Sequence, residues 1–427
     1  MKGIVYLKQK LESKRARVLL RYKFYEMKSS ELNLGRLIPP EQASQYNSVL
    51  GWCAKAVDSL ADRLQLLGLE DDTFDMMEIF NANNPDVFFD SAILSALISS
   101  CCFVYIAQSE TGIPYLQVID GANATGIIDP TTGLLQEGYA VLSRDPDTDK
   151  ALMEAYFAPG ATTVIDKTKR TQQVFKSMAP APLLVPIIYR PDARRPFGHS
   201  RITRACMNLQ NQARMVLTRA DITAEFYSYP QRYVLGLDED ADFDSQKASA
   251  SSFLALSRDD DGNLPQVGQF TQQNMEPHIS QFKMCAAAFA GETGLTMDDL
   301  GFVTENPSSA EAIKASHETL RLTAKKAQRT FGSGFINVGY LASCLREDYA
   351  YNRAAVYETV PRWAPIFEPD ATQMSGIGDA AIKINQAVPG YFDRDSLESL
   401  TGIKAGAEPE ETTAATAYGT NGEKTNA

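Results

Sequence analysis

The chain has few of the residues on which enzymes and metal sites depend. It has three histidines, His199, His278 and His317, which lie far apart, so neither a histidine-rich zinc site nor a histidine-dependent triad is expected. Its six cysteines form no C-x-x-C pair and are too sparse for a disulfide framework, which favours reduced thiols in a cytosolic compartment. Phosphate-loop, dinucleotide-binding, zinc-protease and serine-hydrolase motifs are missing. The sequence therefore predicts no catalytic residue, no metal and no cofactor.

Long hydrophobic runs are also missing. The most apolar stretch, 92–107, has 16 residues and contains three serines, whereas a membrane-spanning helix needs about 20 apolar residues. We expect this stretch to be a buried helix that runs into a strand, and we expect no membrane association. The basic N-terminus is not followed by an apolar segment, so no secretory signal is expected either.

The composition that remains is that of an ordinary globular protein with an acidic bias. The chain has 427 residues, 44% hydrophobic and 22% charged, which at about 150 residues per domain suggests two or three domains. The formal net charge is −12, yet the first 28 residues carry nine Lys and Arg against two Glu. Such an acidic body argues against a protein that grips nucleic acid over its whole surface.

The spacing of apolar residues predicts a chain of the α+β class. Helical periodicity indicates helices near 2–28, 49–67, 74–81, 200–226 and 277–290. Ser308 and Glu311 have the spacing of a capping box and open a further helix, which we expect to be interrupted at 332–334 and to resume to about 351. Two short helices are expected at 371–387 and 394–401.

Short β-prone runs separated by Gly, Pro and Asp predict strands in two regions. The first is a meander over 101–178, after which the proline-rich stretch 180–196 leads away from the sheet. The second is a smaller insert between the helices 200–226 and 277–290, with a hairpin turn at Asp261-Gly262. A last strand is expected at 363–367, and the tail 405–427 is expected to be disordered.

Three groups of residues invite a chemical interpretation. An acidic cluster could bind calcium, but it has Phe243 where an EF-hand loop needs glycine and Ser249 where it needs glutamate. A solvated loop is therefore favoured for its members, Asp238, Glu239, Asp240, Asp242 and Asp244. Asp145, Asp147 and Asp149 are expected in a hairpin turn, and the adjacent Cys101 and Cys102 are expected to be buried, inert thiols.

A stripe of basic residues follows one face of the helix after Pro307. Its members, spaced three or four residues apart, are Lys314, His317, Arg321, Lys325 and Arg329. The stripe could face phosphates. The favoured alternative is a solvated face or one that contacts another subunit.

The order of these elements, with several short motifs, resembles the portal proteins of tailed bacteriophages. The most specific stretch is NPSSAEAIKASHETLRLTAKKAQRTFG (306–332), which is similar to the N-P-x-S-x-x-A-I pattern that opens the long helix after the tunnel loop of that family. VDSLADRL (57–64) resembles an early helix of the family, PFGHSRI (196–202) its Pro/Gly passage, and PRWAP (361–365) the strand before the C-terminal helices. The resemblance covers about residues 40–400.

The resemblance implies a portal-type fold and a division of this chain into named regions. A wing would comprise 1–199 together with the long helix and closing strand of 307–368. The stem would consist of the helices 200–228 and 276–290, with the clip at 229–275, the tunnel loop at 291–306 and the crown at 369–404. The implied channel-lining residues are Lys283, Leu295, Met297, Asp298, Asp299 and Phe302. The loop has no Lys or Arg, so we expect steric contact with DNA, through Leu295, Met297 or Phe302, rather than a basic grip.

The same resemblance implies a non-enzymatic role and a set of partners. Portals are rings of about twelve subunits at one capsid vertex, which arise when a head-to-tail interface closes on itself. Double-stranded DNA passes through them, without sequence specificity, during packaging and ejection. The implied partners are the large terminase subunit, a head-completion or adaptor protein, and the major capsid and scaffolding proteins. The implied location is the virion, after synthesis in the host bacterial cytoplasm. The alternatives are another virion structural protein, such as a minor capsid protein, or a metal-dependent hydrolase that uses the acidic cluster at 238–244.

Overall fold

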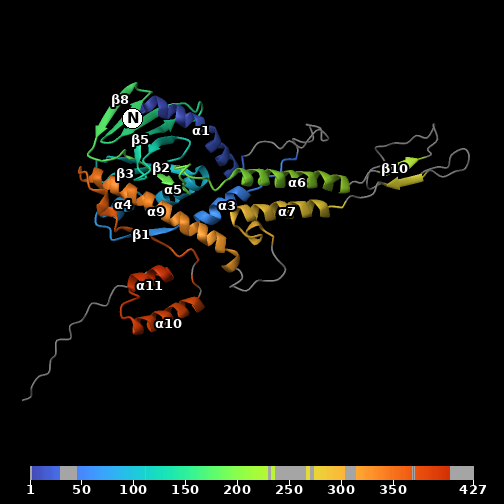
Figure 1. The fold of residues 1–427 in the computed structure, drawn as a ribbon. Coiled ribbons are helices and arrows are strands. Elements are labelled where there is room, and N and C mark those ends of the chain that lie inside the picture. The colour runs from blue at the N-terminus through green and yellow to red at the C-terminus, as the bar shows by residue number, and fades with distance from the viewer. Residues whose placement is uncertain are drawn as a thin grey trace, which may run out of the picture. The chain divides into compact units, whose positions relative to one another are not determined.

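A computed structural model describes residues 2–28, 46–110, 112–228, 232–235, 266–269, 274–302, 314–367, 369 and 371–403. The chain divides into two compact units, Met1–Ile366 and Phe367–Ala427. The larger unit contains both helices and antiparallel sheets, so the α+β expectation is confirmed (Figure 1).

A three-stranded antiparallel sheet lies at the centre of the larger unit. Its strands are β2 (Cys101–Ala107), flanked by β3 (Tyr115–Ile119) and β9 (Leu184–Ile188). The run 92–107 is, as expected, a buried helix that continues into a strand, since α5 (Pro85–Ser99) precedes β2. Strand β9 was not foreseen, because Pro186 lies within it. Its partner is the central strand β2. In the described part of the chain β9 is an edge strand, where a proline that lacks the N–H group is tolerated.

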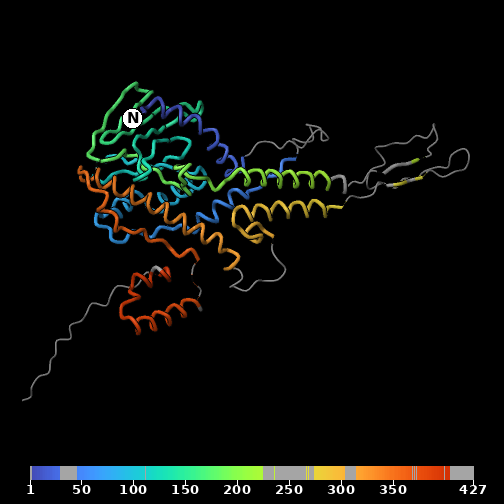
Figure 2. Tube along the Cα trace, viewed as in Figure 1, coloured from blue at the N-terminus to red at the C-terminus, as the bar shows by residue number. Residues whose placement is uncertain are grey.

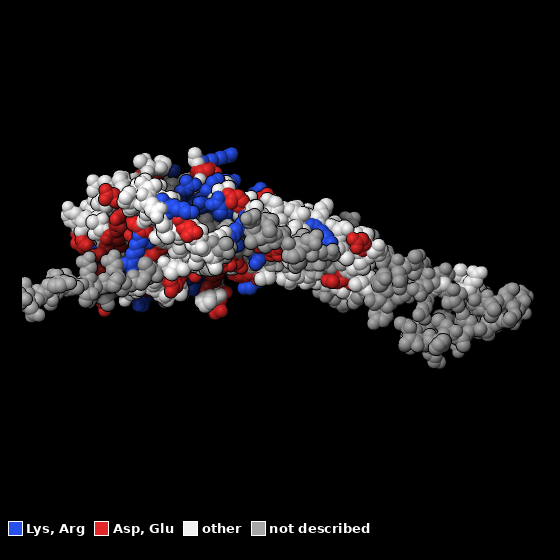
Figure 3. Space-filling model, turned by 90° about the horizontal axis from the view of Figure 1, so that it is seen from below, with Lys and Arg blue, Asp and Glu red and all other residues white. Residues whose placement is uncertain are grey.

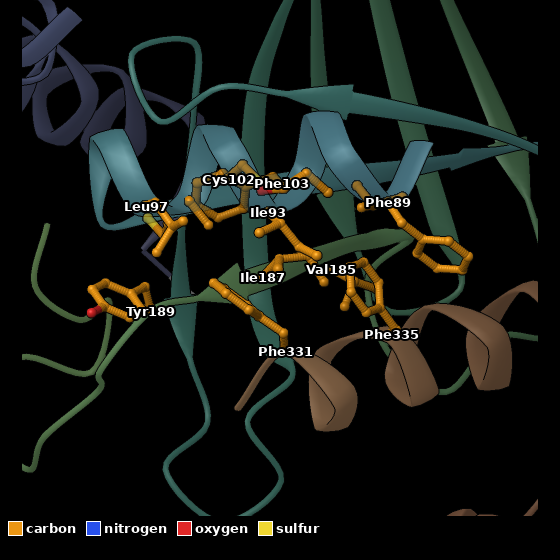
Figure 4. Packing of buried hydrophobic residues seen from close by; sticks show 14 of the residues in the cluster. Phe89, Ile93, Leu97, Cys102, Phe103, Val185, Ile187, Tyr189, Phe331 and Phe335 are labelled. Carbon is orange, nitrogen blue, oxygen red and sulfur yellow. The ribbon is translucent and has the colours of Figure 1, made fainter. Parts of the chain in front are cut away.

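The two faces of strand β2 have different neighbours. On one face the Cys102 Sγ donates to the carbonyl of Ala92 in α5, and α9 (Glu318–Arg346) packs against β9 beside Ile187. Helices α5 and α9 also meet each other, because the Phe89 and Phe335 rings lie 4.8 Å apart in a T-shaped contact (Figure 4). On the other face, Tyr105 contacts Phe157 of the second sheet at 5.2 Å. Because successive side chains of β2 point to opposite faces, the strand packs against helices α5 and α9 on one side and against the second sheet on the other.

The second sheet is a five-stranded antiparallel meander. Its strands, in the order in which they pair, are β4 (Ala124–Ile128), β5 (Leu135–Arg144), β6 (Ala151–Ala158), β7 (Ala161–Asp166) and β8 (Thr171–Lys176). The expected meander over 101–178 is therefore present, but it is divided between two sheets.

Helix α1 (Gly3–Tyr25) lies against the five-stranded sheet. Leu7 and Leu11 are buried there with Tyr139 and Val141. The Lys8 Nζ lies 2.5 Å from Glu154 Oε2, and Lys167 also pairs with this carboxylate. Burial alone would raise the pKa of Glu154, but the hydrogen bonds from Lys167 and Lys8 outweigh it and lower this pKa. The carboxylate therefore stays ionised and links the helix to the sheet.

Two further segments have bounds that differ from those expected, namely the helix expected at 49–67 and the strand expected at 363–367. The expected helix 49–67 ends early, as α3 (Trp52–Ala61), and β1 (Leu66–Glu70) follows it. Strand β1 pairs with β12 (Val360–Trp363), which lies a few residues before the expected 363–367. Helix α4 (Met76–Ala82) lies where a helix at 74–81 was expected.

Helix α9 is continuous, so the predicted interruption at 332–334 is wrong. Gly332 and Gly334 instead allow close packing. A Cβ on Gly332 would lie 2.5 Å from Pro361 Cγ, and one on Gly334 would lie 2.8 Å from Ile187 Cδ1. The glycines are therefore where the helix approaches strands β12 and β9, not where it breaks. The expected helix start at 306–308 lies outside the described residues.

The smaller unit contains α10 (Ala371–Ala387) and α11 (Arg394–Thr401), at the bounds expected from the sequence. Asn385 fixes the connection between them, since its amide donates to the Phe392 carbonyl and accepts from the Phe392 N–H. Asp393 caps α11 by accepting from the Ser396 N–H at 2.8 Å. The expected disordered tail, 405–427, lies outside the described residues.

Replacement of Gly332 by Ala should lower the stability of the protein. Alanine favours a helix by about 1 kcal/mol over glycine, but overpacking against the rigid ring of Pro361 costs about 1–3 kcal/mol. We expect a lower urea midpoint for Gly332→Ala. The exposed neighbour Ser333→Ala is the control and should keep or slightly raise the midpoint. Equal midpoints for the two variants would contradict the packing role of Gly332.

Candidate functional site: the base of the α6–α7 helix pair

Two long helices, α6 (Arg204–Ser228) and α7 (Glu276–Thr293), lie side by side in the larger unit (Figures 1 and 2). They match the helices expected at 200–226 and 277–290. At 1.5 Å per residue, the 25 residues of α6 span about 37 Å. The short antiparallel strands β10 (Arg232–Leu235) and β11 (Gln266–Gln269) lie between them in the chain. Most of the predicted clip, 229–275, lies outside the described residues.

Small and aromatic residues divide helix α7 into two faces. Cys285, Ala286, Phe289 and Ala290 are buried. Lys283, Met284, Ala287 and Ala288 are exposed, so the opposite face carries small or flexible side chains. Such a face permits another helix to approach closely.

An aromatic cluster anchors the base of the pair. Trp52 of α3 lies 5.3 Å from Phe282 and 5.4 Å from Phe289, measured between ring centroids. Phe282 also lies 5.6 Å from Phe302, in the segment that follows α7. These contacts join the early helix, the second long helix and the loop after it into one packed unit.

Two buried arginines complete the anchor. The Arg201 Nη2 donates to the Thr293 carbonyl at 2.5 Å, and its Nε donates to Ala56 in α3 at 3.1 Å. Arg214, of which 2% is exposed, donates from Nε to the Ser48 carbonyl at 2.9 Å and from Nη2 to Asn47 at 3.0 Å. Each guanidinium therefore connects a long helix, or the passage leading into it, to the segment 46–61.

The described part of the predicted tunnel loop is folded against this base. Leu295 is only 6% exposed and belongs to the main core, so its side chain packs inward and does not offer the surface contact expected from the sequence. Met297 and Phe302 are half-buried against the same core. Asp299 accepts hydrogen bonds from the N–H and hydroxyl of Thr296, whereas Asp298 is exposed. Residues 303–306 lie outside the described part.

The predicted basic stripe divides into two parts. His317 Nδ1 lies 3.7 Å from Asp299 Oδ2, and Arg321 donates to both carboxylate oxygens of Glu318 at 2.6 Å. Lys325 and Arg329 instead line a groove of about 770 Å³ beside β12. Lys314 is half-buried. Two of the five residues, His317 and Arg321, thus have carboxylates of their own chain beside them.

Exposed apolar side chains lie in the same groove as Lys325 and Arg329. Leu322 is 49% exposed, Tyr357 69% and Val360 50%. Trp363 lines the groove as well. A solvated or phosphate-facing surface does not need such side chains, whereas a protein contact buries them.

Within the described ranges, no three His, Cys, Asp or Glu side chains are placed to hold a metal ion. The acidic cluster at 238–244 lies outside those ranges. Asp145 accepts from the N–H of Asp147 at 3.0 Å, as expected for a turn. In the described part of the chain, no helix is long and apolar enough to cross a membrane.

All six cysteines are buried, as Cys101 and Cys102 were expected to be. Burial raises the pKa of the Cys101 and Cys102 thiols, so both remain protonated and are poor nucleophiles.

Sequence reasoning located the two long helices but not the residues that fix their base. Trp52 and Arg214 each lie in a helical pattern that gives no sign of their distant partners. The one available signal was compositional. A Trp is rare in this chain, and an Arg is unusual on the otherwise apolar side of a long helix.

Two curated proteins are similar to this chain in sequence. No family model matches the sequence. The portal protein of Mycobacterium phage L5 is 22% identical over 334 residues, covering 73% of this chain and 68% of that protein. The portal protein of Mycobacterium phage D29 is 23% identical over 412 residues, covering 91% of this chain and 82% of that protein.

Among solved structures, similarity is found to the neck of an empty GTA particle and to the virion of a native gene transfer agent particle. The first has a TM-score of 0.47 and 14% identity and covers 83% of this chain and 90% of that chain. The second has a TM-score of 0.43 and 13% identity and covers 82% and 89%. The chain is similar to two curated phage portal proteins, so the resemblance found in its sequence motifs is confirmed. The two homologues come from mycobacteriophages.

Replacement of Arg214 by Met should destabilise the protein by about 2–4 kcal/mol, because the charged hydrogen bonds of the buried guanidinium to the Ser48 carbonyl and the Asn47 side-chain oxygen are lost. Urea unfolding followed by circular dichroism measures this loss. Arg219→Met is the matched control, since Arg219 is exposed on the same helix and its replacement should change stability by less than about 0.5 kcal/mol. A similar loss in both variants would argue against the anchoring role.

Proposed function

We propose that this protein is the portal subunit of a tailed bacteriophage and that copies of it form a ring through which double-stranded DNA enters and leaves the capsid. The observation that carries the proposal is the similarity to a curated portal protein over 91% of the chain. The protein acts as a conduit without enzymatic activity and is located in the virion. A ring of about twelve copies requires a head-to-tail interface that closes on itself.

We assign the regions of the chain by the same reasoning. Helices α6 and α7 form the stem, the intervening 229–275 forms the clip, and 291–306 forms the tunnel loop. The remainder of the larger unit is the wing, and α10 with α11 forms the crown. The exposed face of α7, with Met284, Ala287 and Ala288, supports the stem assignment because it is smooth enough to pack against the stem of a neighbouring subunit.

The charge of the chain suits a channel through which DNA slides. Each copy carries a formal charge of −12. On the face drawn in Figure 3, acidic side chains are widely spread and basic side chains gather in one region. Acidic walls repel phosphates, and salt screens this repulsion over about 8–10 Å, so the duplex stays centred without being held. Lys283 is the exposed basic residue of α7 that could face the channel.

Of the two interpretations of the basic stripe, we favour the subunit contact. His317 and Arg321 lie against Asp299 and Glu318 of their own chain. Lys325 and Arg329 lie beside exposed Leu322, Tyr357 and Val360. A neighbouring subunit would bury these apolar side chains, which DNA phosphates would leave exposed. We assign the groove to the interface between adjacent copies.

The partners follow from the assigned regions. The large terminase subunit docks at the clip during packaging, and a head-completion or adaptor protein replaces it. The major capsid and scaffolding proteins surround the wing. These assignments rest on the homology.

Purified protein should form closed rings with a central hole that admits duplex DNA, because a portal works only as a ring. Negative-stain electron microscopy shows the hole, and native mass spectrometry of the same sample gives the number of subunits. A chain that stays monomeric even when co-expressed with the scaffolding protein of its phage would contradict the proposed function.

Replacement of Leu322 by Asp should reduce ring formation without unfolding the subunit. The substitution puts a charge into an apolar contact, at a site that is 49% exposed in the single chain. Native mass spectrometry should show a shift from rings to monomers, while circular dichroism stays the same. Val174→Asp, at a residue 54% exposed on β8, is the matched control and should assemble normally. Normal assembly of the Leu322→Asp variant would contradict the assignment of the groove to the interface between subunits.

A further inference from the structure

A second cavity, of about 870 Å³, is lined by helix α1, the junction of α5 and β2, the loop 195–203 and the start of α6; we call it the α1 cavity. Seven of its lining residues are basic, and Glu292 is the one carboxylate among them. The basic residues are Lys10, Lys14, Arg17, Arg21, Arg190, Arg195 and Arg204. In a chain with a net charge of −12, this is a local and large excess of positive charge.

Helix α1 distributes its basic residues between two faces. On the face toward the five-stranded sheet, Lys8 pairs with Glu154 and Arg15 pairs with Asp149, both at 2.5 Å. On the face toward the cavity, Lys10, Lys14, Arg17 and Arg21 recur every three or four residues. Within the residues that the structure describes, none of the seven basic side chains of the cavity forms an ion pair with a carboxylate. Among the described residues, the carboxylates that pair with α1 therefore lie on its face toward the sheet.

The cavity holds some of these charges in place with uncharged groups. The Lys10 Nζ donates to the Gly126 carbonyl at 2.7 Å, and the Lys14 Nζ donates to Ala124 at 2.9 Å. Arg21 Nη1 donates to the Ser99 carbonyl at 3.0 Å. Burial, and then the neighbouring cations, lower the pKa of Lys10 and of Arg21. These groups are fixed before any ligand arrives, and a bound anion would relieve their mutual repulsion.

The Glu292 carboxylate does not neutralise the cavity. It accepts a hydrogen bond from the Thr203 hydroxyl at 3.1 Å, at the entry to α6. Two other carboxylates lie nearby. Asp192 Oδ2 lies 2.5 Å from His199 Nε2. Asp120, whose charge opposes the lowering of the Lys14 pKa by burial, accepts hydrogen bonds from the Ala122 N–H and the Asn123 amide. Arg17, Arg190, Arg195 and Arg204 are exposed, so their guanidinium groups remain accessible to a ligand.

We propose that the α1 cavity binds an extended, acidic peptide segment of a partner protein. Arginine guanidinium groups bind carboxylates through two parallel hydrogen bonds, and several arginines converge here. Successive basic residues on α1 are separated by about 4.5–6 Å along the helix axis. Side chains on one side of an extended peptide recur every ~6.6 Å. Alternate glutamates or aspartates can thus meet successive basic residues.

The shape and lining of the cavity favour a peptide over nucleic acid. Phosphates of a duplex lie on a convex surface, whereas this cavity is concave and of the size that takes one ligand or one chain segment. Single strands bind through aromatic platforms. Phe197 is the aromatic side chain among the lining residues, and the ammonium groups of Lys10 and Lys14 lie 5.0 and 5.7 Å from its ring centroid. Val18, Met207 and Pro196 offer apolar surface between the charges, which suits the side chains of a peptide.

The test is fluorescence anisotropy with the full-length chain and a labelled peptide that alternates glutamate with serine and leucine. We expect saturable binding that weakens as salt increases. The same peptide with glutamine in place of glutamate should bind at least tenfold more weakly. Arg17→Gln combined with Arg195→Gln should weaken binding about a hundredfold, since each lost charged hydrogen-bonding pair contributes about tenfold.

The matched control is Lys23→Gln combined with Lys169→Gln, which changes the net charge equally at exposed residues outside the cavity. It should bind like the native chain. Circular dichroism verifies that both double variants are folded. If the Arg17→Gln, Arg195→Gln variant does not fold, the single variant Arg17→Gln takes its place.

Three results would overturn the proposal. The first is equal affinity for the glutamate and glutamine peptides. The second is equal weakening in both double variants. The third is arginine-dependent binding of single-stranded DNA or tripolyphosphate at concentrations where the acidic peptide does not bind, which would make the α1 cavity a phosphate site. The inference does not depend on the portal function, because no assay of ring assembly or DNA passage enters the test.

Discussion

The burial of strand β2 on both faces is the constraint on which the larger unit depends. Alternate residues point to α5 and α9 on one side and to the five-stranded sheet on the other, as the contacts of Cys102 and Tyr105 show. A strand with no solvated face has to be apolar throughout, and CCFVYIA is. Because β2 joins both layers, the positions of α9 and of the sheet that carries α1 follow from it.

Close approach of backbones is the second recurring feature. Gly332 and Gly334 allow α9 to lie against β12 and β9, and Ala286 and Ala290 occupy the buried side of α7. Small residues thus serve packing inside the subunit. In the portal that we propose, the small residues on the exposed side of α7 would serve packing between subunits in the same way.

Charge is distributed unevenly over the described part of the chain. In the portal that we propose, the acidic excess suits a surface past which DNA moves. The basic residues of α1 are divided between carboxylates of the sheet and the α1 cavity, where the described residues provide no ion pair. The stripe on α9 shows a similar division, since Arg321 is paired with Glu318 and Lys325 lies in a groove. A basic residue in this protein can be interpreted only together with the carboxylates near it.

The sequence determined the elements with strong local patterns. These are the long helices α6 and α7, the short helices α10 and α11, the helix-to-strand passage into β2, and the order of motifs that resembles portal proteins. Local periodicity suffices there, because each pattern repeats over many residues. Only the tertiary structure decided that Leu295 is a core residue, that α9 continues through its glycines, and that β9 pairs with β2 despite its proline. It also decided which side chains meet, bringing Trp52 to Phe282 and Arg214 to Ser48. These contacts join residues more than 100 positions apart in the chain, and a local pattern carries no information about a partner at that distance.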